Sequence, residues 1–304
     1  MAKLVECVPN FSEGRRPEVV DEIVGEMLEA GVKLIDREMD PNHNRAVITI
    51  VGEPSAVEEA AFRGVRAAAR LIDLDQHQGE HPRIGSTDVV PFVPISEVSM
   101  DECVEIAHRV GERIARELDI PVYFYERAAT RPERRDLAYI RRGEYEVLKQ
   151  EIGTQTDREP DAGPRRVGKA GATVVGARPF LIAYNVNLNT SDLQIAKEIA
   201  KVTREKGGGL PTVKALGFAL EDKGIVQVSM NLTDFTVTGM LTAFNHVKAE
   251  ADKRGIQVLG SELVGLVPLE ALTRLAGEAL MLEGFNSRQI IEMQLASAEK
   301  PDDK

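Results

Sequence analysis

Short apolar runs and amphipathic segments alternate along the first half of the chain. Runs rich in β-branched residues predict strands, and apolar residues three and four positions apart predict helices. Helices are predicted from about 17 to 30, from Pro54 to about 71, and after a capping-box pattern of Ser99 and Glu102. The predicted strands lie at 4–8, 32–36, 46–52, 89–94 and 121–125.

The same alternation returns in the second half. Helices are predicted from Thr190 to the glycines at 207–209, through Leu241 to Gly255, and after Pro268. The predicted strands lie at 177–188, 212–220, 225–232 and 256–265. Both halves therefore follow the order β-α-β-β-α-β, which is the split βαβ arrangement of a ferredoxin-like sandwich.

This element order predicts an α+β protein built from two ferredoxin-like βαββαβ subdomains. Each subdomain leaves one sheet face uncovered, so we expect the two sheets to face each other with the helices outside. The polar stretch 149–171, which carries Gly and Pro and has no clear period, is expected to hold the boundary. The expected subdomains are residues 1–177 and 178–304, and a cleft between them would suit a ligand.

Composition and charge narrow the class of protein. The 304 residues contain 38 Lys and Arg against 49 Asp and Glu, a net charge of −11, which argues against a nucleic-acid partner. No segment has the length and apolarity of a signal peptide or a membrane helix. Cys7 and Cys103 form no CxxC pair and are expected to fill the core of a cytoplasmic protein.

The loop HQGEHPRIG at 77–85 gathers ionisable side chains between glycines. Its H-x-x-E-H pattern matches a zinc-peptidase signature, but such a site needs a helix that presents both histidines on one face. Gly79 weakens a helix here, and Pro82 disfavours the helical conformation of His81. We therefore expect no metal, and we expect His81 to act as a general acid and base near neutral pH.

Two further polar segments are candidates for binding. The segment 36–45, DREMDPNHNR, is either a polar hairpin loop or a set of carboxylates that orients a histidine or a cationic substrate. The segment 161–171, DAGPRRVGKAG, is either a basic linker or a loop that wraps an anion with backbone N–H groups and positive charge. Polar Asn187 in an apolar strand suggests a ligand contact, since buried amides need partners.

Taken in order, these segments resemble the formiminotransferase family. The stretches that carry the resemblance cover nearly the whole chain. They are LVECVPNFSEGR at 4–15, HNRAVITIVG at 43–52, GEHPRIGSTDVVPFVP at 79–94, the segment 100–129, GATVVGARPFLIAYNVNLNT at 171–190, GGGLPTVKALGFAL at 207–220, QVSMNLTDFTVTG at 227–239 and GSELVGLVP at 260–268.

The resemblance implies two βαββαβ subdomains with folate between them. It also implies transfer of a formimino group between N-formimidoyl-L-glutamate and nitrogen 5 of tetrahydrofolate, which serves as co-substrate. His81 falls on the family's catalytic histidine, and the loop from Gly163 to Gly171 falls on its folate-binding loop. Glu38 is one methylene longer than the carboxylate usual at that position, and Ala162 replaces a frequent aromatic residue.

The expected mechanism assigns His81 to proton transfer and Glu38 or Asp36 to the amidinium charge of the substrate. We expect opposite charge near His81 to keep it protonatable. We expect Arg83, Arg45 and the cations at 165–169 to bind the carboxylates of glutamate and folate. A homodimer is expected because ferredoxin-like units expose sheet edges. The expected folate- and substrate-binding residues are Asn10, His43, Arg45, Arg83, Gly163, Pro164, Arg165, Arg166, Val167, Gly168, Lys169, Ala170, Gly171 and Asn187.

Three alternatives remain open from the sequence. A relative of the same fold could transfer a formyl group from N-formylglutamate to tetrahydrofolate. A folate-binding protein without catalytic activity would keep the basic loop and would not require His81. A zinc hydrolase would bind about one metal per chain.

Overall fold

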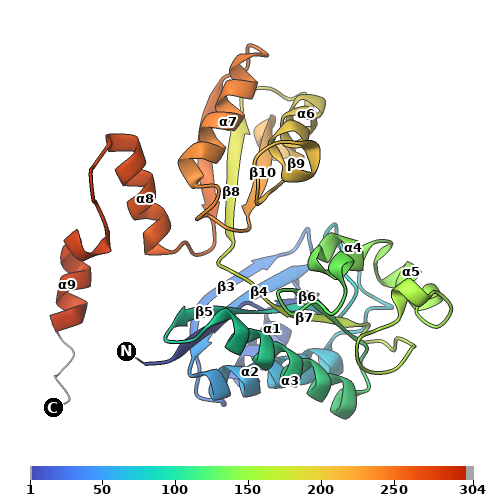
Figure 1. Ribbon diagram of the computed structural model, residues 1–304. Coiled ribbons are helices and arrows are strands. Elements are labelled where there is room, and N and C mark those ends of the chain that lie inside the picture. Colours follow the sequence, from blue (N-terminus) through green and yellow to red (C-terminus); the bar gives the residue numbers. More distant parts are fainter. Residues whose placement is uncertain (1, 299–304) are drawn as a thin grey trace. The chain divides into compact units, whose positions relative to one another are not determined.

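The computed structural model describes residues 2–298 and divides into two compact units between Pro179 and Phe180. Unit 1 is the part before this division and unit 2 the part after it (Figure 1). The expectation that the two sheets face each other stays a prediction.

Unit 1 is built on the predicted ferredoxin-like core. Three antiparallel pairings give the strand order β5-β1-β4-β3, which is the order of a split βαβ sandwich. The six elements of this core are β1 (Leu4–Cys7), α1 (Pro17–Leu28), β3 (Lys33–Asp40), β4 (Arg45–Gly52), α2 (Pro54–Leu71) and β5 (Thr87–Ser96).

Further elements widen this sheet to seven strands. The short strand β2 (Asn10–Phe11) pairs with β4 and β5, and the helix α3 (Met100–Leu118) leads to β6 (Val122–Glu126). The last strand of unit 1, β7 (Thr173–Ala177), inserts between β5 and β6 and runs parallel to both. Between β6 and β7 lie η1 (Pro132–Arg135), α4 (Leu137–Arg141), α5 (Glu144–Glu151) and η2 (Thr156–Arg158).

The stretch 149–171 was wrongly expected to be the boundary between the units. It folds onto unit 1, where Ala162 bridges to Val122 and the Ser86 amide donates to the Ala170 carbonyl at 2.8 Å. The strand expected at 177–188 is in fact two strands in two units. Pro179, which lacks an N–H group for a sheet ladder, lies between them.

Helices cover both faces of part of the unit 1 sheet (Figure 1). One face packs against α1, α2 and α3 through residues such as Ile50, Phe92 and Ile106. On the other face, Val89 and Tyr125 pack against Ile140 of α4 and Leu148 of α5. The helices α4 and α5 therefore cover the β5-β7-β6 half, whereas β3 and β4 carry polar residues on that face.

The capping box predicted at the start of α3 is confirmed. The Glu102 amide donates to Ser99 Oγ at 3.1 Å, and the Ser99 amide donates to Glu102 Oε2 at 2.7 Å. These two bonds satisfy N–H groups that a helix start otherwise leaves without partners. Both cysteines are free and fully buried, as the sequence predicts.

The βαββαβ order predicted for the second half of the chain is confirmed in unit 2. Its sheet is antiparallel with the order β11-β8-β10-β9, and α6 and α7 pack on one face. Asn187 and Gln227 lie on the opposite face. The elements are β8 (Ile182–Leu188), α6 (Leu193–Thr203), η3 (Glu205–Gly207), β9 (Val213–Leu220), η4 (Glu221–Lys223), β10 (Ile225–Leu232), α7 (Met240–Asp252), β11 (Val258–Val264), α8 (Leu269–Leu280), η5 (Ser287–Gln289) and α9 (Ile291–Ala298).

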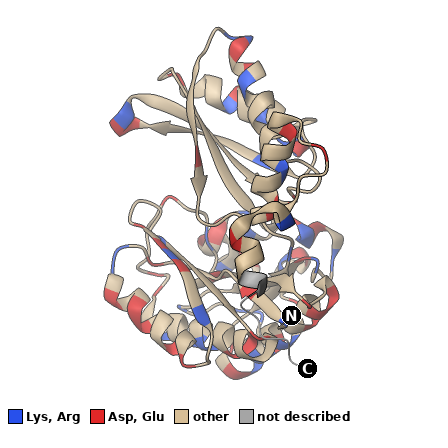
Figure 2. Ribbon diagram, turned by 90° about the vertical axis from the view of Figure 1, so that its left-hand side faces the viewer, with Lys and Arg blue, Asp and Glu red and all other residues tan. Residues whose placement is uncertain are grey.

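Charged residues of both signs are interspersed on the helices of unit 1 (Figure 2). Ion pairs join neighbouring helices, as between Arg70 of α2 and Glu26 of α1 at 2.8 Å. No helix within residues 2–298 has the length and apolarity needed to cross a membrane.

Candidate active site

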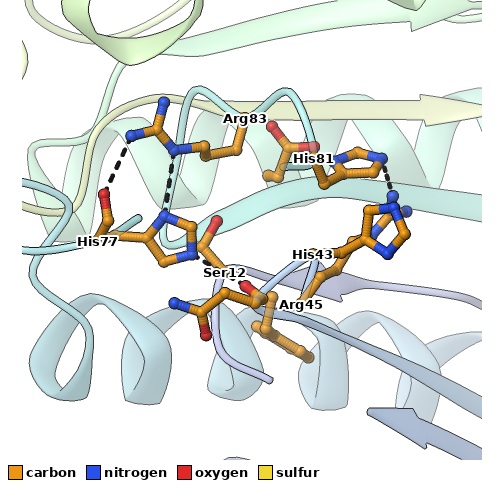
Figure 3. Close-up of a pocket in the computed structure, with 9 residues that line it drawn as sticks. Ser12, His43, Arg45, His77, His81 and Arg83 are labelled. Carbon is orange, nitrogen blue, oxygen red and sulfur yellow. Dashed lines mark hydrogen bonds between the residues drawn. The ribbon is translucent and has the colours of Figure 1, made fainter. Parts of the chain in front are cut away.

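A polar pocket lies in unit 1 where the β3–β4 turn, the end of β2 and the loop before β5 meet (Figure 3). It encloses about 180 Å³ of space, part of which is open to solvent. Four of its side chains are histidine or arginine residues that the sequence singles out for chemistry or binding, namely His43, Arg45, His81 and Arg83. The complete lining is Phe11, Ser12, His43, Asn44, Arg45, His77, His81, Arg83 and Asp88.

Short-range contacts fix the loop 77–85 against the β3–β4 turn. Asn44, in the left-handed conformation with φ 48°, accepts a bond from the Gly14 amide at 2.9 Å and donates to the Gln78 carbonyl at 3.0 Å. A Cβ atom on Gly79 would lie 2.3 Å from the His43 carbonyl oxygen. The loop can therefore approach the turn this closely only because residue 79 is glycine.

His77 holds this loop in place through both ring nitrogens. Arg83 Nε donates to His77 Nδ1 at 3.1 Å, so in the neutral ring His77 Nε2 carries the proton and donates to the Asn44 carbonyl at 2.9 Å (Figure 3). Burial lowers the pKa of His77, which favours this neutral state. The role of His77 is therefore structural.

His81 lies at the pocket with its Nε2 in contact with Arg45 Nη1 (Figure 3). Burial, followed by the charges of Arg45 and Arg141, lowers the pKa of His81 to about 2. The expectation that opposite charge keeps His81 protonatable is therefore wrong, because its nearest charged neighbours are cations. His81 is a neutral base in this structure, with its Nε2 lone pair facing a guanidinium.

Arg141, which the sequence reasoning missed, is the second cation beside His81. It extends from the end of α4 and pairs through Nη2 with Asp88 Oδ2. Asp88 Oδ1 accepts the Ile84 amide at 2.9 Å, so one buried carboxylate ties α4 to the loop. No pattern around residue 141 marks it, since it lies 60 positions from His81 in a stretch without a predicted element.

Arg83 is already committed to two carboxylates of α5. Its Nη1 lies 2.8 Å from Glu144 Oε2, and its Nη2 lies 2.6 Å from Glu146 Oε1. The Arg83 side chain is 8% exposed. This guanidinium anchors α5 to the loop, so it is poorly placed to bind a substrate carboxylate.

The carboxylates of β3 alternate along one face of the strand. Asp36, Glu38 and Asp40 pair in register with Thr49, Val47 and Arg45 of β4. Asp40 Oδ2 lies 2.6 Å from His43 Nδ1, and the His43 and His81 rings lie 6.2 Å apart.

The expectation of a carboxylate that orients a histidine thus holds for Asp40 and His43, a pair that the sequence did not single out. Asp36 Oδ1 instead accepts the adjacent Arg37 amide at 2.9 Å. Glu38 contributes negative charge near Arg45.

The basic loop 161–171 is folded against the loop that carries His81. The Leu74 amide donates to the Lys169 carbonyl at 2.8 Å, and Gly171 bridges to Gly85. Gly163 and Gly171 have φ values of +90° and +71°, which favour glycine. Pro164 and Ala170 belong to the same ordered loop, and Val167 packs into the core of unit 1.

Each cation of this loop already has an acidic partner at the surface. The contacts join Arg165 to Glu159 at 2.8 Å, Arg166 to Asp119 at 2.5 Å, and Lys169 to Asp73 at 2.8 Å. Between 67% and 73% of each cationic side chain is exposed, so an anionic ligand could exchange with these partners. Among the glycines of this loop, Gly168 differs from Gly163 and Gly171 because a Cβ atom on it would meet nothing of the described chain within 4 Å.

The two asparagines expected to bind ligand do not line this pocket. Asn10 is buried in β2 and donates to the Val8 carbonyl at 2.9 Å. Asn187 belongs to unit 2, where its Oδ1 accepts Gln227 Nε2 at 2.9 Å.

The segment 77–83 is not helical, so the geometry that the zinc-peptidase pattern requires is not formed. Within residues 2–298, no three side chains of His, Cys, Asp or Glu are grouped so that they could hold a metal ion. The chemistry that this site offers is that of a neutral histidine beside two guanidiniums.

Comparison with known proteins places both units in one family. The family described as "Formiminotransferase domain, N-terminal subdomain" matches residues 4–178, and that described as "Formiminotransferase domain" matches residues 183–291.

Named relatives match over most of the chain. A glutamate formimidoyltransferase of Thermoplasma acidophilum is 51% identical over 97% of this chain and 98% of its own length. A glutamate formimidoyltransferase of Streptococcus pyogenes serotype M1 is 47% identical, over 97% and 99% respectively. The formimidoyltransferase-cyclodeaminase of Mus musculus is 48% identical over 90% of this chain and 51% of its own length. The chain therefore belongs to the formiminotransferase family.

Proposed function

We propose that this protein is a folate-dependent transferase that moves a formimino group between N-formimidoyl-L-glutamate and nitrogen 5 of tetrahydrofolate. The observation that carries the proposal is the neutral His81 at a pocket flanked by guanidiniums, in a chain of this family. The relatives named glutamate formimidoyltransferase support the substrate pair.

The proposed reaction requires one base that becomes an acid. Nitrogen 5 attacks the amidinium carbon of formimidoylglutamate, and a new C–N bond forms. His81 Nε2 accepts the proton that nitrogen 5 loses and delivers a proton to the glutamate nitrogen. The old C–N bond then breaks, and glutamate leaves as an amine. A neutral histidine suits the first of these transfers, and such proton transfer is typically worth about 10²–10⁴-fold in rate.

We assign the cationic amidinium to the acidic face of β3. Glu38 and Asp36 lie on the same strand face as Asp40, which holds His43. Negative charge there would favour an amidinium over a neutral amidine and so keep the carbon electrophilic. Holding the two substrates in line would supply further rate.

The remaining binding assignments are also proposals. Exposed cations of the basic loop suit the anionic tail of folate, and the space beside Gly168 is open. The set comprises Asn10, His43, Arg45, Gly163, Pro164, Arg165, Arg166, Val167, Gly168, Lys169, Ala170, Gly171 and Asn187.

We further propose a homodimer that works in the cytoplasm in the degradation of histidine. Two free, buried thiols are compatible with a reducing compartment. Sedimentation of the purified protein would test the dimer.

The direct test is tetrahydrofolate-dependent consumption of formimidoylglutamate by the purified protein. N-formylglutamate is tried in parallel. Consumption of the formyl compound alone would replace the proposed donor with its formyl analogue.

His81→Ala separates a transferase from a folate-binding protein. We expect turnover to fall by about 10²–10⁴-fold while the affinity for folate, measured by calorimetry, stays near that of the wild type. Near-normal turnover in this variant would remove His81 from the mechanism. Folate binding without turnover in the wild-type protein would indicate a binding protein.

A further inference from the structure

Within the part of the chain that the structure describes, each of the two guanidiniums beside His81 has one N–H group without a hydrogen-bond acceptor. The Nε atoms of Arg45 and Arg141 are buried and have no hydrogen-bond partner among residues 2–298. Buried donors are satisfied in most folded proteins, so two orphans at one pocket indicate an acceptor that a ligand supplies. Arg45 lines the pocket, and Arg141 pairs with Asp88, which also lines it.

The charges at this place favour an anion. Burial and the charge of Arg141 lower the pKa of Arg45 to about 10, which reports repulsion between the two guanidiniums. Arg83 has its own two glutamates, and the Asp88 carboxylate already accepts bonds from Arg141 and the Ile84 amide. A carboxylate bound between Arg45 and Arg141 would relieve the repulsion and accept both orphan donors.

We propose that Arg45 and Arg141 together bind one carboxylate of the amino-acid substrate beside His81. This inference rests on the proposed function and names the site's second cation, Arg141. Arg83, which the sequence offers beside Arg45 as a ligand for substrate carboxylates, anchors α5 instead.

The contact between Arg45 and His81 gives this carboxylate a second effect. In the free protein, Arg45 Nη1 faces the Nε2 lone pair that must accept the proton of nitrogen 5. A carboxylate that draws the Arg45 guanidinium toward itself frees this lone pair. Binding of the acidic donor thus prepares the base, and a donor without that carboxylate leaves the base covered.

The test compares three donors on the same protein sample: N-formimidoyl-L-glutamate, its α-carboxamide and its γ-carboxamide. Wild-type kcat/KM should fall by about 10- to 100-fold for one of the two amides, the size expected for a lost charge-assisted pair. In Arg141→Gln this preference should shrink to within about threefold, because the residue and the carboxylate form one interaction. Arg141→Lys, which keeps the charge, should restore part of it.

Arg142→Gln is the matched control, because Arg142 follows Arg141 in the chain and pairs with Asp157 away from the pocket. It should keep the full wild-type preference. A ratio between donors does not depend on how much of a sample is folded, so a destabilised variant still gives an answer.

Three outcomes overturn the inference. Wild-type protein that accepts all three donors equally has no such site. Arg141→Gln with an unchanged preference, even where activity falls equally for every donor, reduces Arg141 to a structural partner of Asp88. These two results leave the proposed function intact. The third outcome, a wild type that transfers nothing from any donor, overturns the function and this inference with it.

Discussion

At the scale of single residues, the protonation of His81 links the site to stability. Its pKa is about 2 in the folded protein, against an ordinary value of 6.5. Between these values the unfolded chain binds the proton and the folded protein does not, so stability falls as pH falls below about 6.5. We expect the wild-type melting temperature to drop more between pH 7 and pH 5 than that of His81→Gln.

Burial also lowers the pKa of His77, so His77 likewise makes the folded protein less stable as pH falls. The melting temperature of His81→Gln should therefore still fall in acid, but by less than that of the wild type. Thermal melts of both proteins across this range measure the difference. If the melting temperatures of both proteins changed in parallel with pH, His81 would have an ordinary pKa in the folded protein. That result would contradict an effect of its cationic neighbours.

Gly79 is the residue whose missing side chain lets the loop close. A Cβ atom there would lie 2.3 Å from the His43 carbonyl oxygen and 2.9 Å from Asn44 Cβ. Gly79→Ala must therefore shift backbone, and we expect a cost of roughly 1–3 kcal/mol and a large fall in kcat. Gly25→Ala in α1 meets nothing within 4 Å and should stabilise by about 0.5–1 kcal/mol. Chemical denaturation of both variants tests the contrast, and equal behaviour would refute it.

At the scale of elements, Arg83 joins α5 to the loop 77–85. We expect Arg83→Gln to cost about 1–2 kcal/mol in unfolding free energy, a value reduced because Glu144 and Glu146 are 41% and 58% exposed. The double variant Glu144→Gln, Glu146→Gln should lose a similar amount. KM for formimidoylglutamate should stay within about threefold of the wild type in each. A raised KM without lost stability would return Arg83 to the set of substrate ligands.

Helices and strands with a clear period of apolar residues were predictable from the sequence, and those without such a period were not. Unit 2 and the core of unit 1 follow from alternating strands, amphipathic helices and the Ser99–Glu102 box. The helix α4 has five residues and α5 has eight, too short for a helical period to stand out. They carry Arg141 and the partners of Arg83, so the missed elements explain why the sequence did not mark Arg141 and did not reveal the two carboxylates that hold Arg83.

The candidate site was predictable only where its residues share a segment. His77, His81 and Arg83 stand together in the chain, and the glycine and proline between them excluded a helix correctly. Burial lowers the pKa of His81 most, and the cations that lower it further come from positions 45 and 141, which only the fold brings together. The sequence therefore did not reveal that the charged groups around His81 are cations.

At the scale of the whole molecule, the proposed folate ligands divide between the two units. The basic loop 161–171 belongs to unit 1, whereas Asn187 belongs to unit 2, which has its own hydrophobic core. Each unit is therefore tested by itself, and folate at about 100 times its dissociation constant adds about 2.7 kcal/mol of stability to whatever it binds. Amide hydrogen exchange should slow in the loop 161–171 if its residues bind folate, and in β8 if Asn187 does.

The helix α8 provides an internal control for this exchange experiment, because no residue of it belongs to the proposed binding set. Asn187→Ala separates the two units further. It should weaken folate binding and abolish the protection of β8 while the loop 161–171 keeps part of its own. Protection confined to unit 1 in the wild-type protein would remove Asn187 from the ligand set. It would leave unit 1 alone, with the basic loop packed against the loop of His81, to bind folate.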